Sequence, residues 1–251
     1  FAARESRLHA WGTNRGAPGT IYLQDGNQAD GFGTLIVDSN GTSRSGYTTI
    51  NGNVTEADVG NVVVRRSGKL RVATGVDFVV RGSIANSATI TCMKGSRIVL
   101  ESANDCHISG AVTVDGLVCE VPGKRIFGGT GAGDSLAIAA DGILLLAGTA
   151  ESPIKLLPET GPDRWTLKVN ANATKDVTYV NVSNCNASTG YEVVDFGGRD
   201  LGGNMNWQFF PPVVPGMTNA WTGAASSDPG NSANWSQRRC PVPTDSILVK
   251  A

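Results

Sequence analysis

The chain has 251 residues, of which 17% are charged and 6% aromatic, and its formal net charge is -1. This sparse, balanced charge offers no basic surface for nucleic acid or anionic membranes, and no apolar run approaches the roughly 18 residues of a membrane-spanning helix. Glycine is abundant at 32 residues and helical periodicity is nearly absent, so short strands separated by turns are expected.

Short β-branched runs between Gly, Asn, Asp and Ser predict strands along most of the chain. In chain order the predicted strands are 33–37, 62–64, 77–80, 97–100, 165–169, 177–182, 191–196, 205–210 and 246–250. Three prolines between 211 and 216 cannot join a hydrogen-bonded ladder, so this segment is predicted as a linker. The expected organisation is a β domain over 1–210, the linker 211–216 and a C-terminal β tail over 217–251.

A constant internal period aligns apolar positions in the middle of the chain. The predicted core columns are Val62, Ile90, Val118 and Leu146; Leu70, Ile98, Ile126 and Ile154; and Val80, Ile108 and Leu136. Basic residues align beside the second column at Lys69, Arg97 and Arg125. A translated period is typical of coils that stack in parallel, and parallel crossovers are right-handed. The pattern therefore predicts an all-β fold, a right-handed parallel β-helix of about 28 residues per coil.

The same columns place the cysteines. Cys92 and Cys106 fall on inward positions and are predicted as buried free thiols, whereas Cys119 alternates to the outside. Pairing of Cys185 with Cys240 is left open. A zinc site is not expected, because no pair of cysteines has CxxC spacing.

Candidates for catalysis are few, and the chain is not expected to be an enzyme. The candidate cluster on neighbouring coils consists of Glu101, Asp105, His107 and Asp134, with Lys94 nearby. The favoured interpretation is that the aspartates are turn residues. No catalytic or metal-binding residue is assigned.

No cofactor is expected, although calcium is one alternative for the acidic loop region. That region contains Asp25, Asp30 and Asp38 together with Asn27 and Asn40, at a spacing that matches no calcium-loop signature.

Three stretches resemble the β-helix repeat modules of very large bacterial surface proteins, the autotransporter-like and adhesin-like kind. They are 16–24 with 33–38; 146–156 with 165, 177–183 and 203–209; and 221–223 with 234–236, 243, 245 and 247–249. In those proteins the third pattern resembles the opening of a module, so the order here is circularly shifted. The resemblance implies the fold and an extracellular location at the bacterial surface, and says little about activity.

The end coils of a β-helix expose unpaired backbone groups and invite strand addition. We expect the tail to dock on the N-terminal coil of the next copy, in head-to-tail order. The expected interface residues are Trp221, Trp235, Asp245, Ile247 and Val249. The alternative is that the tail does not dock and is only the truncated end of a longer module.

The expected function is that of a structural subunit of an extracellular bacterial surface fibre, sheath or adhesin stalk, a filament whose main partner is itself. Low charge and a repetitive apolar core fit a durable scaffold. The alternative is a β-helix module that binds or degrades polysaccharide, for which glycans would be the partner. A phage-type trimeric spike is a third interpretation.

Overall fold

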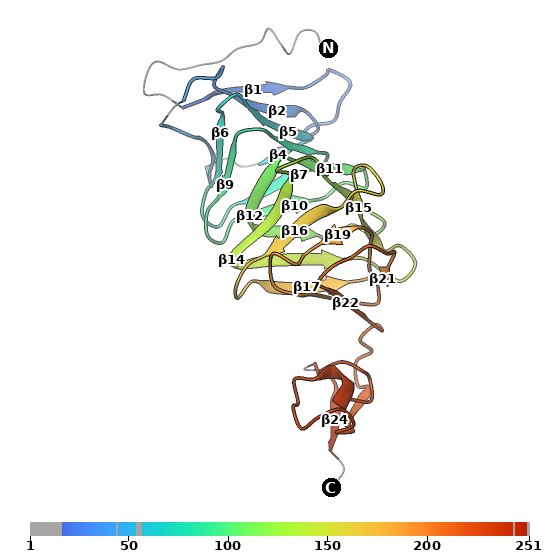
Figure 1. The fold of residues 1–251 in the computed structure, drawn as a ribbon. Coiled ribbons are helices and arrows are strands. Elements are labelled where there is room, and N and C mark those ends of the chain that lie inside the picture. Colours follow the sequence, from blue (N-terminus) through green and yellow to red (C-terminus); the bar gives the residue numbers. More distant parts are fainter. Residues whose placement is uncertain (1–16, 44, 54–56, 243, 250–251) are drawn as a thin grey trace.

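A computed structural model describes residues 17–43, 45–53, 57–242 and 244–249, so positions 16, 243 and 250 of the sequence analysis lie outside the described residues. The fold is nearly all β, and the described part contains no α-helix, only one 3-10 turn, η1 (Ser232–Asn234). Strands stack from one end of the molecule to the other, and the tail lies beyond the last of them (Figure 1). Except for β1 and β2, the paired strands of the described part run parallel.

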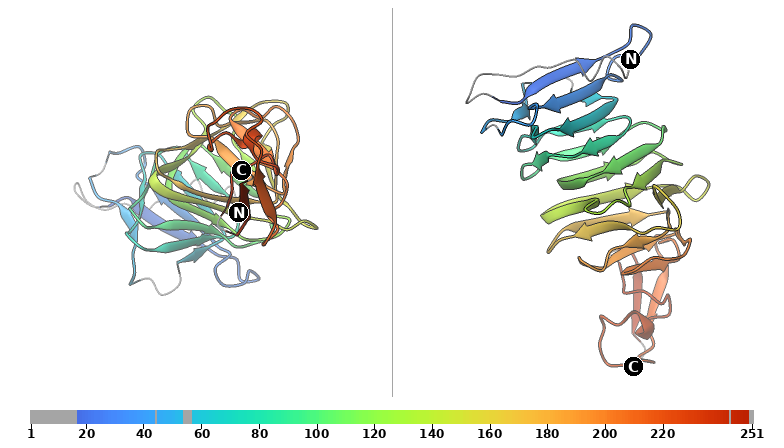
Figure 2. Two further views of the ribbon diagram at one scale, coloured as in Figure 1. Left: turned by 90° about the horizontal axis from the view of Figure 1, so that it is seen from below. Right: turned by 45° about the horizontal axis from the view of Figure 1, so that its top comes forward.

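Two large sheets and one smaller sheet form the stack (Figure 2). The nine-stranded sheet contains, in spatial order, β1 (Gly19–Leu23), β2 (Thr34–Asp38), β5 (Asn61–Arg65), β8 (Ile84–Asn86), β11 (Cys106–Ser109), β13 (Arg125–Gly128), β15 (Ile154–Pro158), β18 (Val180–Val182) and β21 (Arg199–Asp200). The main path of the ten-stranded sheet runs through β4 (Asp58–Val59), β7 (Asp77–Val80), β10 (Arg97–Leu100), β12 (Ala111–Cys119), β14 (Ser135–Ala147), β17 (Thr174–Thr178), β20 (Val193–Phe196) and β22 (Trp207–Phe210). Its other two strands, β16 (Trp165–Val169) and β19 (Cys185–Asn186), branch off this path at β14.

The remaining strands, together with β16 and β19, form a third side and the tail. The third side starts with β3 (Thr48–Ile50), β6 (Lys69–Val72) and β9 (Thr89–Cys92) and ends with β16 and β19. The long strand β14 pairs with β16 through its first half and with β17 through its second half, so it serves two sides. The tail contains β23 (Thr218–Trp221) and β24 (Ser246–Val249).

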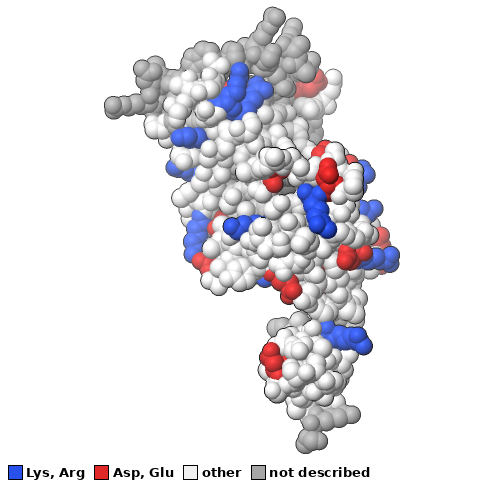
Figure 3. All heavy atoms as spheres, in the orientation of Figure 1, with Lys and Arg blue, Asp and Glu red and all other residues white. Residues whose placement is uncertain are grey.

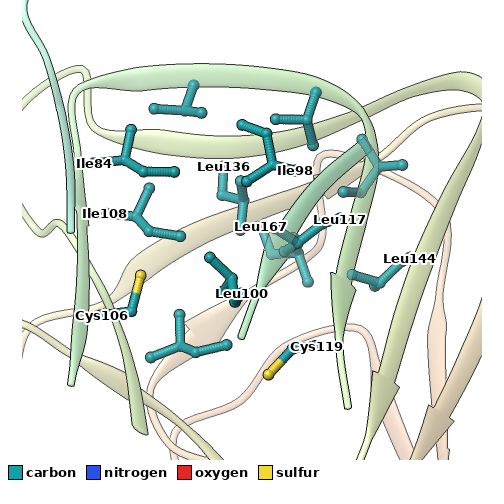
Figure 4. Close-up of a cluster of buried hydrophobic side chains, with 14 of the residues drawn as sticks. Ile84, Ile98, Leu100, Cys106, Ile108, Leu117, Cys119, Leu136, Leu144 and Leu167 are labelled. Carbon is teal, nitrogen blue, oxygen red and sulfur yellow. The ribbon is translucent and has the colours of Figure 1, made fainter. Parts of the chain in front are cut away.

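Apolar side chains from all sides fill the interior between the sheets (Figure 4). Strand alternation directs every second residue inward, as in the buried pairs Leu70 and Val72 on β6 and Phe78 and Val80 on β7. All eleven residues of the predicted columns are buried. Full burial of such a side chain contributes about 1.5–3 kcal/mol, so the core is the main source of stability.

The predicted register of the coils is wrong. Leu70 lies opposite Ile90 in the ladder and not opposite Ile98, which pairs instead with Phe78. The step between these paired strands is therefore shorter than the predicted period. Further along the stack the step is longer than the period, where Ile126 meets Leu156.

The reason is that Leu70, Ile98 and Ile126 share a local pattern but lie on three different sides of the stack, in β6, β10 and β13. One predicted period, from Leu70 to Ile98, advances the chain by one coil and one further strand. Glycine turns look alike on every side, so the sequence pattern does not say which side a strand belongs to.

Ion pairs follow the observed register rather than the predicted one. Arg97 donates from Nε to Oδ1 of Asp77 at 2.7 Å, and Arg125 contacts Asp105 at 2.7 and 2.6 Å. These pairs tie adjacent coils together at the surface, where each contributes about 0–1 kcal/mol. The buried Lys124 reaches back in the same way, and its Nζ donates to the Asn104 carbonyl oxygen at 2.6 Å. Burial lowers the pKa of Lys124.

The prediction that Cys119 faces outward is also wrong, because its side chain is buried in the core (Figure 4). The pairing of β12 with β14 shifts between Val114 and Gly116. After this irregularity Leu117 and Cys119 are both buried, so simple alternation from the start of the strand gives the wrong face.

The other cysteines are also free thiols. Cys106 is buried as predicted, and Cys92 is partly buried against the core. Cys185 is buried and Cys240 is exposed, and both are free, so these two do not pair.

Burial predicts a large difference in thiol reactivity. It raises the pKa of both Cys106 and Cys185 to about 12, which suppresses the reactive thiolate. Iodoacetamide is expected to label Cys240 in the native protein and to label Cys106, Cys119 and Cys185 only after unfolding. Peptide mass spectrometry measures each site. Equal labelling rates at Cys106 and Cys240 in the native state would contradict the buried placement.

Candidate functional site

The tail forms a small unit with a polar interior. Asn234, at the end of η1, is buried and fully hydrogen-bonded: its Oδ1 accepts from the backbone N–H of Ala225 and Ser226 at 2.7 and 2.8 Å. Its Nδ2 donates to Oγ of Ser226 and to the Asp228 carbonyl oxygen. One asparagine thereby organises the glycine- and serine-rich loop that separates the two tail strands.

A second polar contact within the tail is an ion pair. Arg239 donates to both carboxylate oxygens of Asp245 at 2.5 and 2.7 Å, and both side chains are almost inaccessible, with 3% and 0% exposed. The hydrogen bond from Arg239 holds the pKa of Asp245 at about 2, well below its usual range. Asp245 also accepts from the Val242 N–H at 3.0 Å, which fixes the chain just before β24.

Two tryptophans of the tail pack together. Trp221 and Trp235 meet edge to face, with ring centroids 5.1 Å apart and an angle of 72°. Nε1 of Trp235 donates to the Pro229 carbonyl oxygen at 2.9 Å. Trp235 and Asp245, both predicted at an intermolecular interface, therefore hold the tail's own fold together, and Trp221 is partly exposed.

The exposed feature of the tail is β24. It pairs in parallel with β23, so that Trp221 lies opposite Val249. Ile247, Leu248 and Val249 are 60%, 42% and 66% exposed, so apolar side chains stand free on both faces of the strand. Leu248 was not predicted as a site residue. Its position between Ile247 and Val249 in the expected strand was the sequence signal that could have indicated it. No described strand pairs with the outer edge of β24.

The opposite end of the molecule also presents strand edges. β1 runs antiparallel along β2 and covers the end of one sheet. β3 and β4 are the first strands of the other two sides, and no described strand pairs with their outer edges. A hollow of about 420 Å³ opens at this end, and its lining includes Tyr22, Leu35, Ile50, Val59 and Phe78.

Three residues of the candidate catalytic cluster are engaged by partners outside it. Asp105 pairs with Arg125, and Nδ1 of His107 lies 2.6 Å from Oε2 of Glu159. The carboxylate of Asp134 accepts from the backbone N–H of Gly110 and Gly131, which is the structural role of a turn aspartate.

Two carboxylates of the acidic loop region have partners within the protein. Asp38 is engaged by Arg65 and Arg66, while Asp25 accepts from the N–H of Asn27 in a turn. The described residues contain no group of three or more potential metal-ligating side chains.

Charged side chains of both signs are interspersed over the visible face, much of which is uncharged (Figure 3). Among the described residues there is no helix long and apolar enough to cross a membrane. The sequence matches no known family model, no curated protein and no solved structure.

Proposed function

We propose that this chain is a right-handed parallel β-helix module that serves as a structural subunit of an extracellular bacterial surface fibre, sheath or adhesin stalk. In this proposal the copies join head-to-tail through the C-terminal tail, and the module has no enzymatic activity. The stacked parallel sheets and the resemblance of three sequence stretches to surface-protein repeats support it.

The observation that carries the proposal is the exposed strand β24. A two-stranded parallel sheet has little stability by itself, and its outer edge offers a row of free N–H and C=O groups. Exposed Ile247 and Val249 add apolar surface that gains free energy on burial. Such a strand is suited to β-augmentation, in which it becomes part of a neighbour's sheet.

The N-terminal end supplies a complementary surface. Strands β3 and β4 are sheet edges. The hollow beside them is lined by apolar residues such as Val59 and Phe78, and also by the polar residues Gln24, Asp30 and Asp58. The two surfaces lie at opposite ends of an elongated molecule (Figure 1). A contact between unlike surfaces at opposite ends does not close on itself, so it extends into a filament.

The proposal predicts that charge on β24 abolishes assembly without unfolding the tail. The double variant Ile247→Asp and Val249→Asp is expected to sediment as a monomer at concentrations at which the wild type forms a concentration-dependent series of larger species. Both side chains are exposed, so the tail fold is preserved, which the Trp221–Trp235 signal in near-ultraviolet circular dichroism checks.

The matched control carries Met93→Asp and Ile143→Asp, which charge exposed apolar positions in the middle of the stack. This control is expected to assemble like the wild type. Equal sedimentation of all three proteins, whether as monomers or as polymers, would refute assembly through β24.

A further inference from the structure

A carboxyl group is buried near the C-terminal end of the stack. Asp195 lies on β20, and its side chain is inaccessible to solvent. Oδ1 accepts a hydrogen bond from the Val180 N–H at 3.2 Å, whereas Oδ2 makes no hydrogen bond within the described structure. An ionised carboxylate in this position would have lost its hydration without gaining a partner for one of its oxygens.

Oδ2 of Asp195 lies beside Gly198, close to the carbonyl oxygen of Val180. A Cβ added to Gly198 would lie 1.9 Å from Oδ2 of Asp195 and 2.1 Å from the Val180 carbonyl oxygen. The two oxygens therefore flank one small space that only glycine leaves open. Two acceptors on either side of so small a space repel each other when the carboxyl is ionised, and a proton on one of them turns the repulsion into a hydrogen bond.

Among the described residues, no cation forms an ion pair with this carboxyl. Charged side chains on the adjacent segments are exposed, namely Glu192 just before β20, Lys175 and Asp176 on β17 and Arg199 and Asp200 on β21. Tyr179, between β17 and β18, lies against Gly197. Arg239 of the tail approaches Phe196 but is engaged by Asp245. Burial raises the pKa of Asp195 to about 7, although the backbone N–H groups of Val180, Gly198 and Phe196 partly oppose this shift.

We infer that Asp195 is a proton-operated latch, which carries a proton on Oδ2 and donates it to the Val180 carbonyl oxygen. In this state the corner 195–198 is bonded to β18. When base removes the proton to solvent, the hydrogen bond is lost, two acceptors face each other, and the corner loosens.

The latch sits where the stack passes into the linker and the tail. Gly197 donates its N–H to the Phe210 carbonyl oxygen at 2.8 Å, and the rings of Phe196 and Phe210 stack with centroids 5.9 Å apart. The guanidinium of Arg239 lies 5.9 Å from the centre of the Phe196 ring. Loosening the corner 195–198 therefore weakens its contacts with Phe210, just before the linker, and with Arg239 of the tail. The consequence for assembly rests on the proposed function: filaments would hold their subunits more rigidly below about pH 7 than above it.

The sign of the pH dependence follows from linkage. A carboxyl whose pKa is raised in the folded state takes up a proton on folding between about pH 4 and pH 7. Its contribution to stability is present below about pH 4 and is lost as the pH rises through 7. The unfolding equilibrium constant is expected to increase by up to about tenfold per pH unit in this window.

The test compares Asp195→Asn with the wild type in urea titrations from pH 5 to pH 8. The amide cannot ionise, so the variant is expected to lose this part of the pH dependence and to be more stable than the wild type at pH 8. Asp176→Asn, which changes an exposed aspartate on β17, is the matched control and is expected to keep the wild-type slope. Equal slopes in wild type and Asp195→Asn would overturn the latch.

Carbon-13 NMR of the wild-type Asp195 carboxyl provides a second measurement that does not depend on how the variant folds. A signal that stays that of an ionised carboxylate down to pH 5 would overturn the inference. Both experiments are done on dilute monomer. A failure of filament assembly would therefore leave the latch intact, and a failure of the latch would leave assembly through β24 intact.

Discussion

Replacing Gly110 with alanine is expected to destabilise the stack by more than about 4 kcal/mol, enough to prevent folding of a marginally stable domain. Gly110 has a φ of +80°, and a Cβ at this position would lie 1.6 Å from the Asn86 carbonyl oxygen of the preceding coil. The strain of a positive φ costs about 1–2 kcal/mol. The larger cost arises because the backbones of two hydrogen-bonded coils would have to separate.

Gly95→Ala is the matched control for this effect. Gly95 has a similar φ of +76°, but a Cβ there would meet nothing closer than the Gly75 N at 3.8 Å. Its substitution is therefore expected to cost only the strain, about 1–2 kcal/mol. Urea unfolding followed by far-ultraviolet circular dichroism measures both. Similar losses in the two variants would show that coils are not in contact at Gly110.

The second large effect is expected in the tail, where Arg239→Met leaves the carboxylate of Asp245 buried without its cation. Removal of one partner of a buried ion pair costs about 3–5 kcal/mol. In a unit as small as the tail this loss is expected to unfold residues 217–249 while the stack stays folded. The near-ultraviolet signal of the Trp221–Trp235 pair should disappear, and the far-ultraviolet signal of the sheets should remain.

Arg238→Met is the control, because Arg238 is the exposed neighbour of Arg239. It is expected to keep the tryptophan signal. Retention of the tryptophan signal in Arg239→Met would contradict the role of the ion pair.

The Arg239–Asp245 ion pair also determines how the tail responds to acid. Because the pKa of Asp245 is lowered, the pair contributes stability above about pH 4 that is lost as the pH falls through about 2.

Strand positions could be predicted from the sequence because they depend on local composition. The expected strands 97–100 and 165–169 coincide with β10 and β16. The expected strand 177–182 is divided in the structure, since Tyr179 has a φ of +52° and separates β17 from β18. Register could not be predicted, because it depends on turn lengths that differ from coil to coil while the strand patterns repeat on every side.

The candidate site was predictable only in part, for a similar reason. The sequence predicted Ile247 and Val249 as interface residues; the structure shows both side chains exposed, and their role at an interface stays a prediction. Asp245 and Trp235 turn inward because their partners, Arg239 and the Pro229 carbonyl oxygen, are brought to them by the tail's fold. The buried carboxyl of Asp195 gave no signal in the sequence, where it is one polar residue inside the expected strand 191–196. Only the approach of Gly198 and Val180 makes it unusual.

Negative-stain electron microscopy of the intact chain tests head-to-tail assembly most directly. The chain is compared with the Ile247→Asp, Val249→Asp double variant and with a form lacking residues 217–251. Head-to-tail assembly through β24 predicts filaments one molecule wide for the wild type and single particles for both altered proteins. Single particles in all three samples at high protein concentration, or filaments that persist without β24, would contradict it.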